Sequence, residues 1–240
     1  MKRKTILVTG ANKGIGFAAA GQFADLGYTV YLGARDTALG TAAAQTLSGR
    51  GDVRFLQLNV TSDDSVRQAA SRLAEEVECL DALVNNAAIF PRFPPVPPSE
   101  ASVELLRAAY ETNVFGVVAV TLAMLPLLRK AAQPRVVNLS SRLGSIALVE
   151  PAGVRRNPPS LEYHTSKTAL NAVTAHFAAE FLGTPFKFNA ASPGRVRTQM
   201  IQETEGRPPD EGARIVVHLA TLPPDGPTGG FFSDEGPVPW

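Results

Sequence analysis

The chain of 240 residues is poor in the residues that build disulfides and metal centres. Its single cysteine, Cys79, has no partner for a disulfide within the chain, which excludes a small secreted fold held together by disulfides. The three histidines, His164, His176 and His218, are scattered and show no HExxH or similar ligand spacing. We therefore expect no metal site.

Excess charge of one sign and long hydrophobic runs are also missing. The 23 basic and 22 acidic side chains leave a net charge of +1, which excludes the broad basic surface that nucleic-acid binding needs. The longest apolar stretch, 114–128, is interrupted by Gly116, Thr121 and Pro126 and is shorter than the roughly 18 apolar residues of a membrane span. The apolar run after the basic start, 6–8, is too short for a signal peptide. We expect a cytoplasmic protein with no nucleic-acid or membrane partner.

Short runs rich in valine, leucine and isoleucine alternate with longer amphipathic stretches. This pattern predicts strands at 5–9, 28–32, 53–58, 81–85, 135–139, 186–191 and 229–232. It predicts helices at 14–26, 37–47, 62–77, 99–110, 114–128, 161–181 and 210–220. Strands of this composition are covered on both faces, and the alternation implies right-handed crossovers. We predict one α/β domain over residues 1–240, a doubly wound parallel sheet of about seven strands with helices on both faces.

A glycine-rich turn, Thr9-Gly10-Ala11-Asn12-Lys13-Gly14-Ile15-Gly16, connects the first predicted strand to the first predicted helix. Glycine permits a positive φ and lets the backbone approach a diphosphate closely. The helix that starts near Gly14 directs free N–H groups and the positive end of its dipole at the same point. A turn in this place is typical of dinucleotide binding in a Rossmann fold. The alternative is a tight turn whose glycines serve packing alone.

Charge predicts which dinucleotide binds. In Rossmann folds an acidic residue after the second strand accepts from the ribose 2′-OH, whereas an arginine there accommodates a 2′-phosphate. Arg35 follows the second strand here, and Lys13 adds a second positive charge. Asp36 comes next and is expected to cap the following helix. These residues favour NADPH; the alternative is that Arg35 and Lys13 are solvated surface charges.

Further motifs follow the glycine turn in order. They are Asn85-Asn86-Ala87-Ala88 after the fourth strand, Asn113, Ser140-Ser141 after the fifth strand, Tyr163-x-x-x-Lys167, and Pro193-Gly194-x-Val196-x-Thr198. Together they resemble the short-chain dehydrogenase/reductase family over essentially the whole chain, and most of all its NADPH-dependent carbonyl reductase branch. We expect the cofactor half at about 1–90 and the catalytic and substrate half at about 91–240.

The resemblance implies which residues contact the cofactor. They are Gly10, Asn12, Lys13, Gly14, Ile15, Gly16, Arg35, Asn59, Val60, Asn86, Ala87, Tyr163, Lys167, Pro193, Gly194, Val196 and Thr198. Two positions depart from the family pattern. Asn59 stands where the family often has an aspartate that holds the adenine amino group, and its carbonyl can still accept that bond. Ala88 replaces a glycine and removes no chemistry.

Tyr163 and Lys167 lie four residues apart on a predicted helix and therefore on one face. A free tyrosine has a pKa of about 10, which a nearby lysine cation lowers. The resemblance implies that Lys167 also binds the nicotinamide ribose and that Asn113 orders a water leading to it. Ser141 is expected to hydrogen-bond the substrate carbonyl. Ser140 is the weaker candidate because Ser141 has the family's spacing.

The implied reaction is reduction of a ketone or aldehyde, in which NADPH gives hydride to carbon and Tyr163 gives a proton to oxygen. Two alternatives stay open: an NADP-dependent alcohol dehydrogenase working in the oxidative direction, and a non-catalytic NADP-binding sensor. Homodimer, homotetramer and monomer also stay open. Arginines near the expected substrate end form either a positive pocket mouth or solvated loop charges: Arg142, Arg155, Arg156, Arg195 and Arg197.

Overall fold

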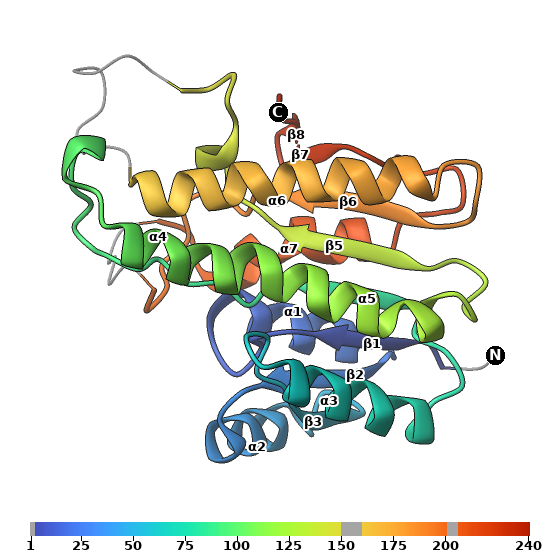
Figure 1. Cartoon of the computed structure of the whole chain (residues 1–240). Helices are drawn as coiled ribbons and strands as arrows, with labels where there is room; N and C mark the ends of the chain where they lie inside the picture. Colours follow the sequence, from blue (N-terminus) through green and yellow to red (C-terminus); the bar gives the residue numbers. More distant parts are fainter. Residues whose placement is uncertain (1–2, 150–159, 201–205) are drawn as a thin grey trace.

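A mostly parallel sheet forms the centre of the molecule (Figure 1). In the computed structural model, which describes residues 3–149, 160–200 and 206–240, it has eight strands in the order β3-β2-β1-β4-β5-β6-β7-β8. The strands are β1 (Thr5–Val8), β2 (Thr29–Ala34), β3 (Val53–Gln57), β4 (Ala82–Asn85), β5 (Arg135–Leu139), β6 (Lys187–Ala191), β7 (Phe231–Ser233) and β8 (Gly236–Pro237). The prediction of a single doubly wound α/β domain is confirmed.

The edge of the sheet differs from the prediction. All pairings from β3 through to β7 are parallel, as expected, but β8 returns antiparallel and pairs Phe232 with Pro237 and Ser233 with Gly236. A two-residue strand made of glycine and proline has neither the alternation nor the β-branched residues that identify a strand in sequence. The prediction of about seven strands therefore missed this edge.

Seven α-helices cover the sheet within the described ranges. They are α1 (Gly14–Asp25), α2 (Thr37–Leu47), α3 (Asp63–Glu76), α4 (Val103–Tyr110), α5 (Gly116–Leu128), α6 (Leu161–Glu180) and α7 (Pro209–Ala220). Side-chain caps start several of them. Asp36 accepts from the Leu39 N–H at 2.8 Å, so its predicted capping role is confirmed. Ser102 and Ser160 cap α4 and α6 in the same way.

The helix predicted at 99–110 begins later than expected. The residues between it and the next predicted helix, at 114–128, are also helical. A short 3-10 turn, η1 (Pro98–Glu100), comes first, and α4 starts after Ser102. Between α4 and α5 the chain forms a π-helical turn, η2 (Glu111–Phe115). The two predicted helices are therefore one long helix with a wide turn at Asn113, and π-turns of this kind are frequent at functional sites.

Two apolar layers hold the helices on the sheet. Side chains of α1, α2 and α7 form one layer with one face of the sheet, and those of α3, α5 and α6 form the other. Successive residues of β1 alternate between them, with Ile6 and Val8 in the first and Leu7 in the second. Both faces are covered, which explains why the strands are continuously apolar.

One helix in the described part of the chain is long and apolar enough, by length and composition, to cross a membrane. It runs from Val103 to Leu128 through α4, η2 and α5, and 56% of its most apolar window is buried. Val120 and Met124 belong to the layer on the sheet. The helix has the apolar composition of a core helix, because one face packs against the strands.

Candidate active site

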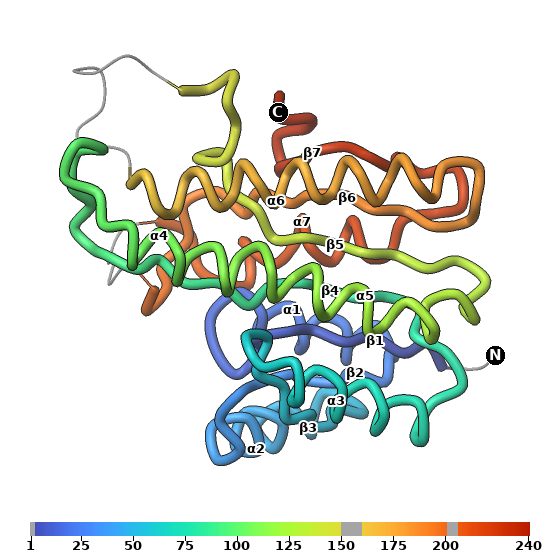
Figure 2. The backbone as a smooth tube through the Cα atoms, viewed as in Figure 1, coloured from blue at the N-terminus to red at the C-terminus, as the bar shows by residue number. Residues whose placement is uncertain are grey.

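The residues predicted to carry chemistry gather at one edge of the sheet. The order β2-β1-β4-β5 places the point at which the winding reverses between β1 and β4. Ligands of such folds bind beyond the carboxyl ends of the strands at this point. The glycine turn follows β1, Asn86 follows β4, and Ser141 follows β5. Figure 2 shows the chain leaving β1 and β5 on the same side of the sheet.

Hydrogen bonds tie the glycine turn to the end of β4. Thr9 Oγ1 accepts from the backbone N–H groups of Asn86 and Ala87, each at 3.0 Å. The Asn86 amide donates to the carbonyls of Thr9 at 2.8 Å and Gly10 at 3.0 Å. A Cβ on Gly10 would lie 2.8 Å from Ala87 Cα. The structure therefore uses the Asn86 side chain to shape the turn, and its predicted cofactor contact stays a prediction.

The start of α1 fits an anion. Its N-cap residue, Lys13, makes no side-chain capping bond, and the first turn contains no acidic residue. Gly14 has a φ of 58°, and the nearest atom to a Cβ built there is Thr198 Cγ2 at 3.7 Å. Free N–H groups on an uncapped helix start and an open glycine backbone suit a diphosphate.

The two predicted phosphate ligands lie near this helix start. The Ala11 N–H donates to the Gly33 carbonyl at 2.9 Å, which joins the glycine turn to the end of β2, just before Arg35. Arg35 is exposed, and no ion pair or hydrogen bond to its side chain is found within the described ranges. Lys13 Nζ donates to Gln199 Oε1 at 3.3 Å. An exposed guanidinium with no carboxylate partner is suited to a 2′-phosphate.

Asn59 is engaged differently from the expectation. Its Oδ1, expected to receive the adenine amino group, already accepts from the Thr61 N–H at 3.3 Å and from Thr61 Oγ1 at 3.0 Å. These two bonds use both lone pairs of the oxygen, so a further donor has no acceptor there. An adenine contact by Asn59 therefore stays a prediction and would use its amide N–H groups or an opened turn.

The segment that starts at Pro193 is held by a residue that sequence reasoning missed. Arg207 Nε donates to the Pro193 carbonyl at 2.8 Å, and Nη1 pairs with Asp234 at 2.5 Å. A β-bridge also joins Val196 to Arg207. Gly194, which follows Pro193, has a φ of 73°. Arg207 lies outside every predicted motif, 14 residues after Pro193, so only the fold reveals its role.

Ser141 and Tyr163 form the centre of the candidate catalytic group. Their side chains are hydrogen-bonded to each other, and this bond lowers the pKa of the phenol. Burial has the larger and opposite effect, and it raises the pKa of Tyr163 to about 12. At neutral pH the phenol therefore keeps its proton.

Lys167 lies below the same ring, with Nζ 5.7 Å from the centroid of Tyr163. It is buried and donates to the Leu139 carbonyl at 2.7 Å, and burial lowers its pKa to about 7. The predicted lowering of the Tyr163 pKa by Lys167 stays a prediction; in this arrangement burial has the larger effect on the phenol. The ammonium is directed at a carbonyl and is only partly charged at neutral pH, so desolvation dominates the pKa of the phenol.

The neighbouring serines have different surroundings. Ser140 is buried and donates to Asn171 Oδ1 at 2.5 Å. Ser141 caps the short 3-10 turn η3 (Arg142–Gly144), where its Oγ accepts from the Leu143 N–H at 3.2 Å, and it remains half-buried. The position of Ser141 beside Tyr163 agrees with the preference for Ser141, rather than Ser140, as the residue that contacts the substrate carbonyl.

Asn113 lies in the π-turn η2 and is fully buried. Its Oδ1 accepts from the Ile89 N–H at 2.9 Å, and its amide donates to the Ile89 carbonyl and to Ser166 Oγ, each at 3.0 Å. Ser166 Oγ in turn donates to the Tyr163 carbonyl at 2.7 Å. Both amide hydrogens thus bond to protein atoms, so an ordered water would need one of the oxygens of Asn113.

The family profile of the short chain dehydrogenases matches residues 4–208 of the sequence. The chain belongs to the short-chain dehydrogenase/reductase family. The predicted family and the class of oxidoreductase are therefore confirmed.

Proteins similar to this family member along its whole length include carbonyl reductases. Carbonyl reductase (NADPH) 1 of Mus musculus is 34% identical over 278 aligned positions, covering 99% of each chain. That of Homo sapiens is 35% identical over 274 positions, covering 98% of this chain and 97% of its own. The NADPH-bound carbonyl reductase from chicken fatty liver has a TM-score of 0.85 at 26% identity, with 100% of both chains covered. Salutaridine reductase from Papaver somniferum has a TM-score of 0.83 at 29% identity, covering 97% of this chain and 100% of its own.

Of the five arginines near the substrate end of this short-chain dehydrogenase, Arg142 has an ion-pair partner in the described residues. Arg142 pairs with Glu235 at 2.8 Å, a partner from the C-terminal turn that the sequence did not suggest. Glu162, an acidic residue of α6, is buried and accepts from the Ser102 N–H and from Ser160 Oγ. Arg155 and Arg156 lie outside the described residues. Whether the mouth is positive stays a prediction.

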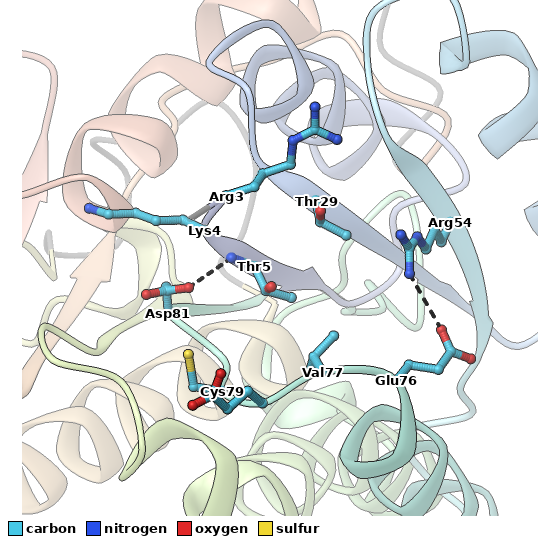
Figure 3. Close-up of a pocket in the computed structure, with 10 residues that line it drawn as sticks. Arg3, Lys4, Thr5, Thr29, Arg54, Glu76, Val77, Cys79 and Asp81 are labelled. Atoms are coloured by element: carbon cyan, nitrogen blue, oxygen red, sulfur yellow. Dashed lines mark hydrogen bonds and ion pairs between the residues drawn. The ribbon is translucent and has the colours of Figure 1, made fainter. Parts of the chain in front are cut away.

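A pocket of about 240 Å³ lies at the opposite edge of the sheet (Figure 3). Thr5, Thr29 and Asp81 line it, and each stands at the amino end of a strand. The Thr5 N–H donates to Asp81 at 2.8 Å, and Arg54 lies 3.9 Å from Glu76. This pocket is separated by the length of the strands from Ser141 and the glycine turn, and it has no part in the candidate active site.

Proposed function

We propose that this protein is an NADPH-dependent reductase that converts the carbonyl of a ketone or aldehyde into an alcohol. The observation that carries the proposal is the hydrogen-bonded pair of Ser141 and Tyr163 above the buried Lys167. It stands at the same sheet edge as the uncapped start of α1. A proton donor and an anion-binding helix start are the two parts that such a reaction needs.

The chemistry of each residue follows from its surroundings. Tyr163 keeps its proton at neutral pH because its pKa is raised, so it acts as the general acid toward the carbonyl oxygen. Ser141 has one hydroxyl hydrogen, which it gives to Tyr163 in this structure. With substrate bound, we propose that this hydrogen turns to the carbonyl oxygen and stabilises the developing alkoxide. When bound, the nicotinamide supplies the hydride. A phenol that remains protonated favours reduction over the oxidative alternative.

The remaining roles are proposed on the same basis. Lys167 is proposed to bind the nicotinamide ribose, and Asn113 to hold the backbone on which Tyr163 stands. The glycine turn and the segment 193–198 are proposed to hold the diphosphate and the nicotinamide. Arg35 and Lys13 are proposed to select NADPH over NADH, which agrees with the names of the carbonyl reductase relatives.

Oxidation of NADPH with a panel of ketones, aldehydes, quinones and ketoesters, followed at the nicotinamide absorbance, tests the proposal. We expect turnover with part of the panel, and a loss of at least about a hundredfold in kcat for Tyr163→Phe with unchanged NADPH binding. Tyr110→Phe is the matched control, because Tyr110 lies at the end of α4 and its ring meets that of Phe115. Full turnover by Tyr163→Phe contradicts the assignment, and NADPH binding without any turnover by the unmodified protein supports the sensor alternative.

A further inference from the structure

An aromatic side chain from outside every predicted motif covers the candidate catalytic tyrosine. The ring of Phe90 lies over the ring of Tyr163, with centroids 4.6 Å apart and planes inclined by 30°. Phe93 then meets Phe90 edge-on, with centroids 6.3 Å apart. Offset and tilted arrangements at this separation are attractive because of the charge distribution of aromatic rings. Phe90 is thus a direct neighbour of the phenol, in the loop after β4.

The backbones that carry the two rings are tied to one amide. Asn113 bonds to both the N–H and the carbonyl of Ile89, the residue before Phe90, at 2.9 and 3.0 Å. Through Ser166, the same amide is linked to the carbonyl of Tyr163 at 3.0 and 2.7 Å. Phe90, Ile89, Asn113, Ser166 and Tyr163 therefore close a ring of contacts. A closed ring fixes the distance between the two aromatic side chains more firmly than either loop alone could.

Besides Phe90, the Tyr163 side chain meets Ser141, His164 and Lys167. Its hydroxyl is hydrogen-bonded to Ser141, and His164 meets its ring edge-on at a centroid distance of 6.4 Å. The residue as a whole is half-buried, and the Phe90 ring covers one face of its ring. A half-buried ring held at one end by a single hydrogen bond keeps rotational freedom unless a neighbour packs on its face.

We propose that Phe90 is a positioning residue for Tyr163: its ring holds the phenol in the plane that keeps the hydroxyl on Ser141 and excludes water from the covered face. The proposal rests on the proposed reductase function, in which Tyr163 is the acid. Phe90 acts through Tyr163 and touches neither hydride nor proton. A substrate carbonyl then meets a phenol that is already oriented, which raises kcat and leaves cofactor binding unaffected.

Water exclusion also connects Phe90 to the protonation of the phenol. The titratable groups beside Tyr163 are Lys167 under the ring and His164 at its edge. Arg92 lies on the Phe90 loop and acts on the charge of Glu162. Glu162, the preceding residue, is turned toward Ser102 and Ser160. Removing the Phe90 ring leaves these groups in place and hydrates the phenol, so the pKa of Tyr163 falls toward its ordinary value.

Three variants of Phe90 separate stacking from filled volume: Phe90→Ala, Phe90→Leu and Phe90→Tyr. For Phe90→Ala we expect a fall in kcat of about tenfold, with KM for NADPH within about twofold of the unmodified protein. The basic limb of its kcat profile, where the phenol loses its proton, should move down by about half to one pH unit. Phe90→Leu should keep the position of the limb and lose part of kcat, and Phe90→Tyr should keep both.

A second measurement does not depend on turnover. In protein with isotope-labelled tyrosine, stacking on Phe90 shifts the Tyr163 ring resonances, which are assigned by their loss in Tyr163→Phe. We expect Phe90→Leu to abolish this shift and Phe115→Ala to leave it unchanged. Phe115 is an exposed aromatic residue in η2 whose ring meets only that of Tyr110 among the described rings. If no carbonyl is reduced by the unmodified protein, the reductase proposal fails while the resonance shift still reports on the stack.

Three results would overturn the proposal. One is a Phe90→Ala protein whose kcat and basic limb equal those of the unmodified protein. Another is a Phe90→Tyr protein that loses as much kcat as Phe90→Ala, since an aromatic ring would then not be the property that matters. The third is a set of Tyr163 resonances that is the same with and without the Phe90 ring. Where Phe90→Ala does not fold, Phe90→Leu supplies the same comparison.

Discussion

Ser140 donates a hydrogen bond to Asn171 Oδ1 at 2.5 Å. This contact gives Ser140 a structural role that its neighbour Ser141 does not share. Asn171 also donates to the Gly144 carbonyl at 3.2 Å, so Ser140 belongs to the framework that holds the turn after β5. Ser141 lies one residue further, at the turn itself, where it reaches Tyr163.

Substitution by alanine should therefore affect activity at one serine and stability at the other. Ser141→Ala removes a donor to the carbonyl oxygen, and we expect kcat to fall by about a hundredfold to a thousandfold with little change in Tm. Ser140→Ala leaves Asn171 Oδ1 buried without this donor, and we expect unfolding free energy to fall by about 1–3 kcal/mol. Steady-state kinetics and denaturant unfolding of both variants check this. The reverse pattern would exchange the roles of the serines.

Arg35 should decide between the two nicotinamide cofactors. Its guanidinium is exposed at the end of β2 and has no ion-pair partner within the described ranges. Arg35→Ala should raise KM for NADPH by about tenfold to a hundredfold and leave KM for NADH nearly unchanged, because only NADPH has the 2′-phosphate. Arg67→Ala is the matched control, since Arg67 is an exposed arginine paired with Asp64 on α3. An equal effect on both cofactors would show that Arg35 does not read the phosphate.

Burial of Lys167 should appear in the pH dependence of stability. Its pKa falls from the ordinary 10.5 to about 7 in the folded chain. Between these values the unfolded chain binds a proton that the folded chain does not, so stability rises with pH. The destabilisation is full below about pH 7 and disappears above about pH 10.5.

Lys167→Met tests this linkage. We expect the gain in unfolding free energy of Lys167→Met over the unmodified protein to be largest near about pH 6.5. This gain should shrink by a few kcal/mol toward about pH 9.5. Loss of the hydrogen bond to the Leu139 carbonyl changes the unfolding free energy equally at every pH, because that carbonyl does not titrate. Denaturant unfolding across this range gives the slope, with the exposed Lys130→Met as control. Parallel curves for Lys167→Met and the unmodified protein would contradict a lowered pKa.

Asn86 should act on cofactor binding through the glycine turn. Its amide bonds the carbonyls of Thr9 and Gly10, so Asn86→Ala releases the turn from the end of β4. We expect a loss of about 1–3 kcal/mol in unfolding free energy and a weaker NADPH affinity. Fluorescence titration of NADPH and thermal unfolding measure the two effects, and Gln68→Ala on the exposed face of α3 is the control. Unchanged affinity with lowered stability would make Asn86 purely structural.

Much of the fold could be read along the chain. Strand and helix positions follow from local apolar periodicity, and Asp36 caps α2 as predicted. The helix start at 99 was placed too early, because the prolines before Ser102 favour a short 3-10 turn over a continued helix. The π-turn at Asn113 has no sequence signature, so a continuous helix was divided into two.

The candidate site was predictable only in part. The ordered motifs pointed to Ser141, Tyr163 and Lys167, and the structure places these three side chains together. Phe90 and Arg207 belong to no motif, so their contacts with Tyr163 and Pro193 depend on how distant segments pack.

The sequence by itself determined the α/β class, the order of the elements and the residues that belong to the family motifs, because these depend on local patterning and residue chemistry. Tertiary structure alone decided the direction of the pKa shift at Tyr163 and the use of the Asn86 and Asn59 side chains within turns. Burial and hydrogen-bond partners arise from segments far apart in the chain. A lysine four residues from a tyrosine is local information; whether the lysine is charged there depends on everything packed around it.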